Sequence, residues 1–466
     1  MNSSAASDAA PTRELARWIA RLAYADLPPR TKEVVRILLL DTLGCGVYGY
    51  ATPWAKMLLD WAKAGAPAKG IATVWGDAAP SLRASDAALV NGTAVHAFEL
   101  DDYHQAKLHP GAVVIPAAVA LAEQLDCSGE RFLTAVAAGY EVMIRTSLAL
   151  DPSAARLRGW HLTGVCGPFG AAAACASLLG LDEERTAWAL GLAGTQGSGL
   201  WAFNADGTMS KRFHAGRAAQ SGVMAAELAA LGFSGPTRIY EFHDGGMLKA
   251  FSDASDPAPL TRDLGTRFHL DTTAIKPYSC CGSTHSYVDA AYELRGRLGT
   301  PWNPQRRVRA GMAKVVDVQC GFDYAPGSAL NAQMSLRYVL AAALLEGQVL
   351  PPQFGDATMA DPALTSLAQR IELEHDPALD KVYPARFSAW VAAEDKGAWM
   401  RVDVADPLGS PANPVGAQGV VAKFRGINPQ LPVDRIADVA LDIERHSVKE
   451  LLALLAGTQS RQLKTA

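Results

Sequence analysis

GWHLTGVCGPFGAAAACASLLGL, residues 159–181, is an uncharged run that sets the class of fold. The run is long enough to span a bilayer, but it contains His161, Pro168 and five glycines, and its apolar content is mostly alanine. We therefore interpret it as a helix buried among close neighbours rather than as a membrane span. Small side chains such as Gly170, Ala171 and Ser177 let helix axes approach closely, so the run predicts a tight helical bundle.

The same pattern extends outward over residues 12–232, with apolar residues at three-to-four spacing, many alanines, and breaks at glycine or proline. This half of the chain is predicted to be all-helical. The expected helices cover residues 14–24, 31–48, 53–64, 84–100, 112–124, 129–150, 164–179, 183–195 and 211–231.

The pattern changes after about Phe268, where short, partly alternating stretches bounded by proline, glycine or charged turns indicate strands. Strands are expected at residues 313–320, 369–374, 385–393 and 399–404, with a helix at 335–346 between them. Helix returns around Lys423 and Phe424 and at residues 447–455, where Ser447 and Glu450 have capping-box spacing. The chain is therefore expected to return to its first domain.

The composition is that of a globular protein of more than one domain. The chain has 466 residues, of which 49% are hydrophobic and 19% charged, and its net charge of -4 gives no overall basic field for nucleic acid or an anionic membrane. Its seven cysteines are an odd, scattered set, which favours reduced thiols in a cytoplasm over a secreted disulfide framework. The first residues lack the pattern of a signal peptide, so a cytoplasmic protein is expected.

A group of titratable residues lies between two apolar helices in NGTAVHAFELDDYHQAKLHPGAVVIP, residues 91–116. Carboxylates beside imidazoles can orient a histidine tautomer and tune it for proton transfer. The alternatives are a polar loop with Asp and His caps, or a metal site made by Asp101, His104 and His109, whose spacing matches no known zinc motif. The group comprises Glu99, Asp101, Asp102, His104, Lys107 and His109.

Three further segments could bind or transform an anion. His161 stands just before a small-residue helix, whose N-terminus suits a carboxylate, although a structural histidine fits equally well. Lys211 and Arg212 open another helix, where cations oppose the helix dipole, so we favour anion binding over an exposed first turn. In KPYSCCGSTH, residues 276–285, a nucleophilic Cys281 with His285 is an alternative that lacks an obvious third group. Dinucleotide, P-loop, serine hydrolase and zincin motifs are absent.

Together these segments resemble the MmgE/PrpD family, which includes 2-methylcitrate dehydratase, cis-aconitate decarboxylase and iminodisuccinate epimerase. The resemblance rests on these pieces: residues 40–44 (LDTLG), 91–110, 139–141 (GYE), 159–161 (GWH), 211–214 (KRFH), 276–278 (KPY), Thr284-His285 and Lys423-Phe424. It implies a mainly α fold in which residues 1–267 and 409–466 form a large helical domain and residues 268–408 form a smaller inserted α+β lid domain. It also implies a homodimer that uses no cofactor and no metal.

The same resemblance implies an active site between the helical domain and the lid. The expected catalytic residues are Asp101, His109, His161 and Lys211, with either histidine as the base and Asp101 orienting the imidazole. The expected substrate-binding residues are Tyr103, Tyr140, Arg145, Arg212, Lys276, Cys281 and His285.

The implied substrates are small di- or tricarboxylates from which a proton next to a carboxylate is removed, while lysine and arginine stabilise the charge. A departing hydroxyl makes the reaction a dehydration, a proton returned to the opposite face an epimerisation, and a departing carboxylate a decarboxylation. Cys281 and Cys320 stand where the decarboxylase branch has a lid histidine and tyrosine, so a hydro-lyase is expected first. The alternatives are an epimerase of an iminodisuccinate-like acid, a cis-aconitate-type decarboxylase, and a carboxylate-binding protein without catalysis.

Overall fold

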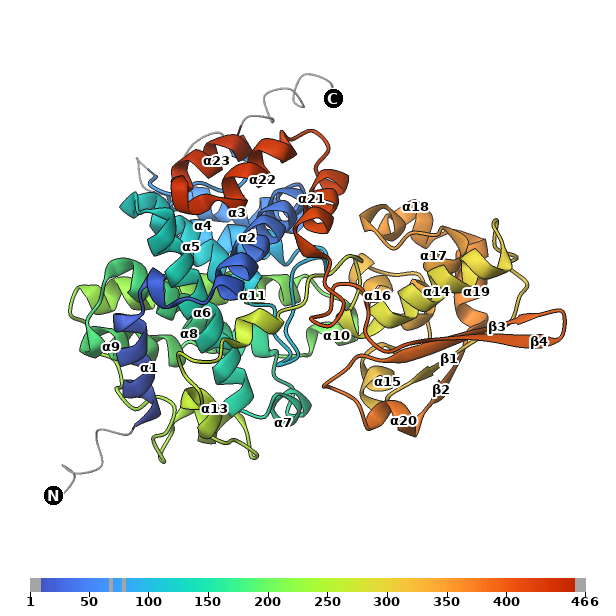
Figure 1. Cartoon of the computed structure of the whole chain (residues 1–466), viewed down its shortest axis with the longest axis horizontal. Helices are drawn as coiled ribbons and strands as arrows, with labels where there is room; N and C mark the ends of the chain where they lie inside the picture. The colour runs from blue at the N-terminus through green and yellow to red at the C-terminus, as the bar shows by residue number, and fades with distance from the viewer. Residues whose placement is uncertain (1–9, 67–69, 78–80, 457–466) are drawn as a thin grey trace.

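The computed structural model describes residues 10–66, 70–77 and 81–456. Helices from both ends of the chain pack into one body, and the segment between them forms a second body beside it (Figure 1). The helices of the first body are α1 (Pro11–Arg21), α2 (Pro29–Tyr50), α3 (Pro53–Ala64), α4 (Ala84–Val95), α5 (Gly111–Leu125), α6 (Gly129–Ala149), α7 (Pro152–Leu157), α8 (Leu162–Leu179), α9 (Glu183–Gly194), α10 (Phe203–Asp206), α11 (Ser210–Ala230), α12 (Met247–Phe251), α13 (Ala258–Thr261), α21 (Gly416–Ile427), α22 (Val433–Leu441) and α23 (Val448–Ala456).

Helix α8 is the centre of the first body and carries most of the uncharged run. It packs against α5, α6, α9 and α11, and 89% of its apolar window is buried inside the protein. It is also the one helix, among the described residues, that is long and apolar enough by itself to cross a membrane. At its crossing with α6, a Cβ on Gly139 would lie 2.8 Å from the carbonyl oxygen of Gly170, and the reverse holds at the same distance. Only residues without side chains allow this approach, so the prediction of a buried helix with close neighbours is confirmed.

The second body combines helices with a small mixed sheet of strand order β2-β1-β3-β4 (Figure 1). Strand β1 pairs in parallel with β2 and antiparallel with β3, and β3 pairs antiparallel with β4. The elements are α14 (His285–Leu298), α15 (Lys314–Cys320), α16 (Ala329–Met334), α17 (Leu336–Leu345), α18 (Asp356–Met359), α19 (Pro362–Arg370), α20 (Pro377–Asp380), β1 (Val308–Met312), β2 (Glu372–His375), β3 (Ala389–Asp395) and β4 (Ala398–Val404).

Two hydrophobic clusters correspond to these bodies. The first contains buried residues from Leu15 to Ile275 and again from Val420 to Leu455. Apart from Phe203, the second runs from Tyr278 to Val402. The predicted mainly α class is confirmed.

One expected strand is wrong, because residues 314–320 form helix α15. Its valines suggested a strand, but Val316 is buried while Val318 is 66% exposed, which is a helical rather than an alternating pattern. Strand β1 was not predicted, although its buried apolar residues Val308, Ala310 and Met312 alternate as in a strand. Gly311 is needed there, since a Cβ would lie 2.2 Å from the indole of Trp390.

Candidate active site

The loop between α4 and α5, residues 96–110, carries the group of titratable side chains noted in the sequence and is held in an unusual conformation. Glu99 and Lys107 both have positive φ, +55° and +59°, which side-chain-bearing residues rarely adopt. From α21, the Lys423 ammonium donates to Asp41 Oδ1 at 2.7 Å and to the Leu100 carbonyl oxygen at 2.6 Å. The returning C-terminal segment therefore fixes this loop.

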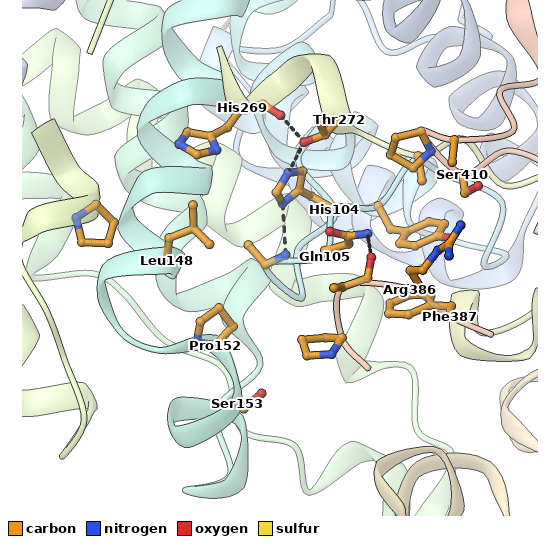
Figure 2. Close-up of a pocket in the computed structure, with 18 of the residues that line it drawn as sticks. His104, Gln105, Leu148, Pro152, Ser153, His269, Thr272, Arg386, Phe387 and Ser410 are labelled. Atoms are coloured by element: carbon orange, nitrogen blue, oxygen red, sulfur yellow. Dashed lines mark hydrogen bonds between the residues drawn. The ribbon is translucent and has the colours of Figure 1, made fainter. Parts of the chain in front are cut away.

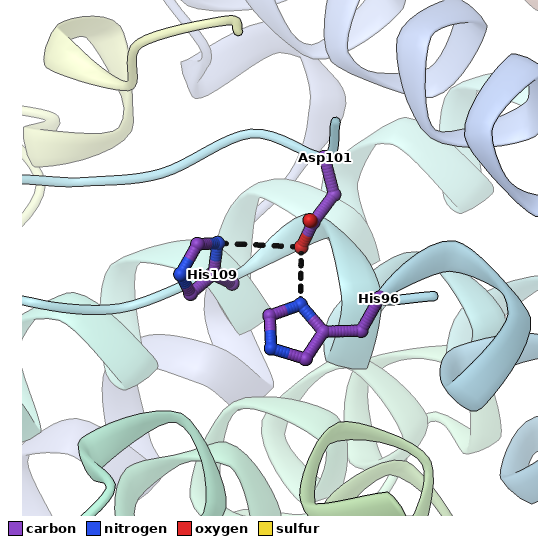
Figure 3. A group of neighbouring side chains, drawn as sticks. All are labelled: His96, Asp101 and His109. Carbon is purple, nitrogen blue, oxygen red and sulfur yellow. Dashed lines mark hydrogen bonds and ion pairs between the residues drawn. The ribbon is translucent and has the colours of Figure 1, made fainter. Parts of the chain in front are cut away.

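Asp101 is fully buried and binds two imidazoles (Figure 3). Its Oδ2 lies 2.7 Å from His96 Nδ1 and 3.3 Å from His109 Nδ1. Burial alone would raise the pKa of Asp101, but the two histidines bring it well below its ordinary value. Burial lowers the pKa of His96 to about 3, so this ring is neutral near pH 7. The donor atoms of the three side chains lie within 4.8 Å of one another, close enough to hold a metal ion, but the shared hydrogen bonds account for the arrangement without one.

The tautomer of His109 follows from its contacts. Its Nδ1 lies 2.9 Å from the carbonyl oxygen of Asp102, which can only accept, so Nδ1 carries the proton. In the neutral ring, His109 Nε2 is the atom with the lone pair that can accept a proton. This carboxylate-oriented imidazole is the arrangement of a general base.

Asp102 anchors the start of α5 behind the site. It accepts hydrogen bonds from the Gly111 amide at 2.8 Å and from the Tyr140 hydroxyl at 2.7 Å. Burial raises its pKa to about 7. Tyr140 is thus occupied by Asp102, and we assign it to holding the loop.

Glu99 joins the two bodies through a buried three-residue ion cluster. Its carboxylate accepts from Lys211 Nζ of α11 and from Lys276 Nζ, the latter at 3.0 Å. Burial and the neighbouring Lys276 lower the pKa of Lys211, whereas the ion pair with Glu99 favours its charged form. One carboxylate faces two ammonium groups, so the cluster can accept a further negative charge, such as that of a carboxylate ligand.

These groups meet at a small cavity of about 90 Å³. Its wall combines residues of the helical body, among them His109 and His161, with Cys281 and Ser283 of the second body. The His161 Nδ1 lies 3.0 Å from His214 Nδ1, and its ring is stacked 5.9 Å from that of His96. Burial, followed by the other imidazoles, lowers the pKa of His161 well below its ordinary value. The titratable residues lining the cavity are Glu99, Tyr103, His104, Lys107, His109, Arg156, His161, Lys211, Cys281 and Tyr383.

The arginine at this cavity is Arg156, a residue that the sequence interpretation missed. Its guanidinium lies 3.5 Å from the centre of the Trp201 ring, and its buried Nε has no hydrogen-bond partner among the described residues. Arg212 instead donates to the Ala97 carbonyl oxygen at 2.8 Å and stacks on Trp54, so it supports the loop after α4 and does not line the cavity.

Two other predicted binding residues are held away from the cavity. The Arg145 guanidinium is bonded to Glu141 and to the carbonyl oxygens of residues 259, 262 and 267. His285 is buried, with its Nε2 3.3 Å from the Cys280 carbonyl oxygen. Neither lines the small cavity.

A large cavity of about 890 Å³ adjoins the small one through Tyr103, His104, Gln105 and Phe387 (Figure 2). His104 points into this region, where its Nε2 bonds the Thr272 hydroxyl at 3.0 Å and its Nδ1 accepts from the Ala106 amide. Asp101, His104 and His109 therefore do not form the alternative metal set, because the third residue grouped with Asp101 and His109 is His96.

Comparison with known proteins identifies the family. Models of the MmgE/PrpD N-terminal and C-terminal domains match residues 13–260 and 278–446. The chain belongs to the MmgE/PrpD family. Its similar relatives include the cis-aconitate decarboxylase-like protein oryM of Aspergillus oryzae, 30% identical over 96% of this chain and 97% of the relative. The cis-aconitate decarboxylase of Aspergillus terreus is 30% identical over 95% of each chain, and that of Homo sapiens is 30% identical over 78% of this chain and 77% of the human protein.

Membership in the MmgE/PrpD family agrees with the resemblance drawn from short motifs. The structure adds three residues to the expected site: His96, Glu99 and Arg156. Glu99 was visible as part of the titratable group, but His96 lies at the end of an apolar helix, and Arg156 stands only two residues from Arg158 in the sequence. These residues are distinguished from their sequence neighbours by the groups that they contact in space, which sequence spacing does not reveal.

Proposed function

We propose that this protein is a lyase that removes a proton next to a carboxylate of a small polycarboxylate, with loss of a β-hydroxyl as the leading reaction. The observation that carries the proposal is His109, whose protonated Nδ1 is bonded to Asp101 and the Asp102 carbonyl oxygen while the ring lines a cavity rich in cations. The C–H bond breaks and its proton moves to Nε2, while the electron pair is delocalised onto the adjacent carboxylate. That electron pair then forms the C=C bond as the β C–O bond breaks, and the hydroxide leaves as water with a proton from Lys211.

The cations of the cavity are assigned to the substrate's carboxylates. Arg156, whose guanidinium lies over the Trp201 ring, and Lys107, whose Nζ donates to the Tyr383 hydroxyl at 3.1 Å, line the same space. Lys211 stabilises the developing charge or returns a proton. This set of positive groups supports a di- or tricarboxylate over a neutral substrate.

A second candidate is decarboxylation of cis-aconitate. The names of the relatives that match over 95% or more of this chain favour it. Both reactions use the same proton-transfer group and differ in which bond breaks, so the product distinguishes them.

The test is proton NMR of the purified protein in D2O with citrate, 2-methylcitrate, cis-aconitate, malate and related acids. We expect exchange at a carbon next to a carboxylate, with an unsaturated acid formed from a hydroxy acid. Itaconate and carbon dioxide from cis-aconitate would establish the second candidate. An acid that binds saturably but keeps all its protons would contradict both reactions and indicate a carboxylate-binding protein.

The assignment of Arg156 is tested by Arg156→Gln. Loss of a charge-assisted hydrogen bond is expected to raise KM about 10- to 100-fold with a smaller change in kcat. Arg158→Gln is the matched control, because Arg158 lies two residues away and pairs with the exposed Asp253. Equal KM values for the two variants would remove Arg156 from the binding site.

A further inference from the structure

Two thiols meet at the wall of the small cavity. Cys281 lines the cavity and immediately precedes the short helix η3 (Gly282–Thr284). Cys320 is the last residue of α15, which packs against η3. The Cys320 thiol donates a hydrogen bond to the Cys281 sulfur, and neither is in a disulfide.

The surroundings of Cys281 favour its thiolate. The hydrogen bond from Cys320, the nearby Lys276 and the backbone amide of Ser283 outweigh burial and lower the pKa of Cys281 below its ordinary value. The pKa values of the other six thiols are raised, by the contact with Cys281 for Cys320 and by burial for the rest. Of the seven thiols, Cys281 is therefore the one whose surroundings favour the nucleophilic thiolate.

The charged and titratable groups around Cys281 come from several elements. Lys211 of α11 and Lys276 stabilise the thiolate, although both are paired with Glu99. The remaining groups that interact with it are Tyr103, Lys107, Cys280, Cys320 and Tyr383.

We propose that Cys281 is a site of reversible oxidation by hydroperoxides, with Cys320 as the thiol that resolves the oxidised form into a disulfide. In the first step the Cys281 thiolate attacks one peroxide oxygen, the O–O bond breaks, and sulfenic acid and hydroxide (or an alkoxide) form. In the second step the Cys320 sulfur attacks the Cys281 sulfur, the S–O bond breaks, and a disulfide and water are produced once the thiol proton is counted. Two thiols are oxidised and one peroxide is reduced.

Oxidation at this position is expected to stop turnover. Cys281 lines the same cavity as His109, His161 and Lys211, so a disulfide there alters the wall against which the substrate binds. This consequence rests on the proposed function, whereas the chemistry of the two thiols does not.

The experiment treats the whole protein with hydrogen peroxide near pH 7, blocks the remaining thiols under denaturing conditions and maps the peptides by mass spectrometry. We expect a Cys281–Cys320 cross-link, a fall from seven to five free thiols in each chain, and recovery of all seven with dithiothreitol. For any acid of the NMR panel that exchanges protons with D2O, this exchange should stop after peroxide treatment and return after dithiothreitol. Lowering the pH should slow the reaction, because the thiolate becomes protonated.

Two variants sharpen the result. In Cys320→Ser the resolving thiol is absent, so peroxide should carry Cys281 on to sulfinic acid, which dithiothreitol does not reverse. Cys280→Ser is the matched control, since Cys280 is adjacent to Cys281 but buried with a pKa raised to about 12, and the Cys281–Cys320 cross-link should persist in it.

A Cys280–Cys281 cross-link, random oxidation of several thiols, or full reversal in Cys320→Ser would overturn the proposal. The mapping needs no substrate, so it decides the thiol pair independently of turnover. If no acid of the panel exchanges protons with D2O, this result counts against the proposed function. The Cys281–Cys320 cross-link still decides whether the two thiols react as proposed.

Discussion

The two adjoining cavities differ in their chemical groups, and the smaller cavity has more groups that can act on a substrate. The large cavity, about 890 Å³, is lined by His104, whose ring is already bonded to the Thr272 hydroxyl and the Ala106 amide (Figure 2). The small cavity, about 90 Å³, gathers an oriented imidazole, an arginine that lies over an indole ring and a lysine of the Glu99 cluster. The convergence of groups with unfilled chemical roles, rather than volume, identifies the candidate active site.

The largest effect should come from removing the imidazole of the small cavity. His109→Ala is expected to lower kcat about 10²- to 10⁴-fold, because the proton acceptor is lost. His269→Ala, on the wall of the large cavity, should leave kcat unchanged. Both are measured as initial rates on the acid that shows exchange, and equal losses would mean that the large cavity takes part in catalysis.

Breaking the Glu99 cluster should affect both stability and turnover. Glu99→Gln leaves Lys211 and Lys276 without their buried counter-charge and is expected to cost about 3–5 kcal/mol of unfolding free energy. Glu141→Gln breaks a separate buried pair, with Arg145, and should destabilise the fold while preserving kcat. Urea unfolding and initial rates separate the two effects, and retained turnover in Glu99→Gln would place the cluster outside the site.

The unfolding free energy should depend on pH through the carboxyl group of Asp102. Its pKa in the folded protein is raised to about 7 from the ordinary 3.8, so its protonated form stabilises the fold below about pH 4, and this contribution is lost as pH rises toward 7. Asp102→Asn should remove this loss, which is on the order of 2–4 kcal/mol between pH 4.5 and 7.5. Parallel pH profiles of unfolding free energy in the two proteins would show that the carboxyl does not titrate in this window.

The smallest effect is expected at the outer wall of the large cavity. Arg386 is bonded to Asp406, and its side chain is 53% exposed. Arg386→Ala should change the unfolding free energy by about 1 kcal/mol or less and leave KM unchanged, because exposed ion pairs contribute little. A large rise in KM would show that substrate binds in the large cavity, and the small cavity would no longer be the candidate binding site.

Sequence alone determined the helical class of the protein and the neighbourhood of its site. The alanine- and glycine-rich run of α8 admits close helix packing whatever surrounds it, and Asp101, His109, His161 and Lys211 stand out because ionisable groups interrupt apolar helices. Such signals are local, so they can be read from spacing and residue type.

Tertiary structure decided which of those groups act together. His96 replaced His104 beside Asp101, Glu99 bridged lysines that are 65 residues apart in sequence, and Arg156 rather than Arg212 reached the cavity. Helix α15 formed where valines suggested a strand, which brought Cys320 to Cys281. Burial and partner choice depend on how distant segments pack, and these determine the pKa, the tautomer and the lone pair on which the proposed chemistry depends.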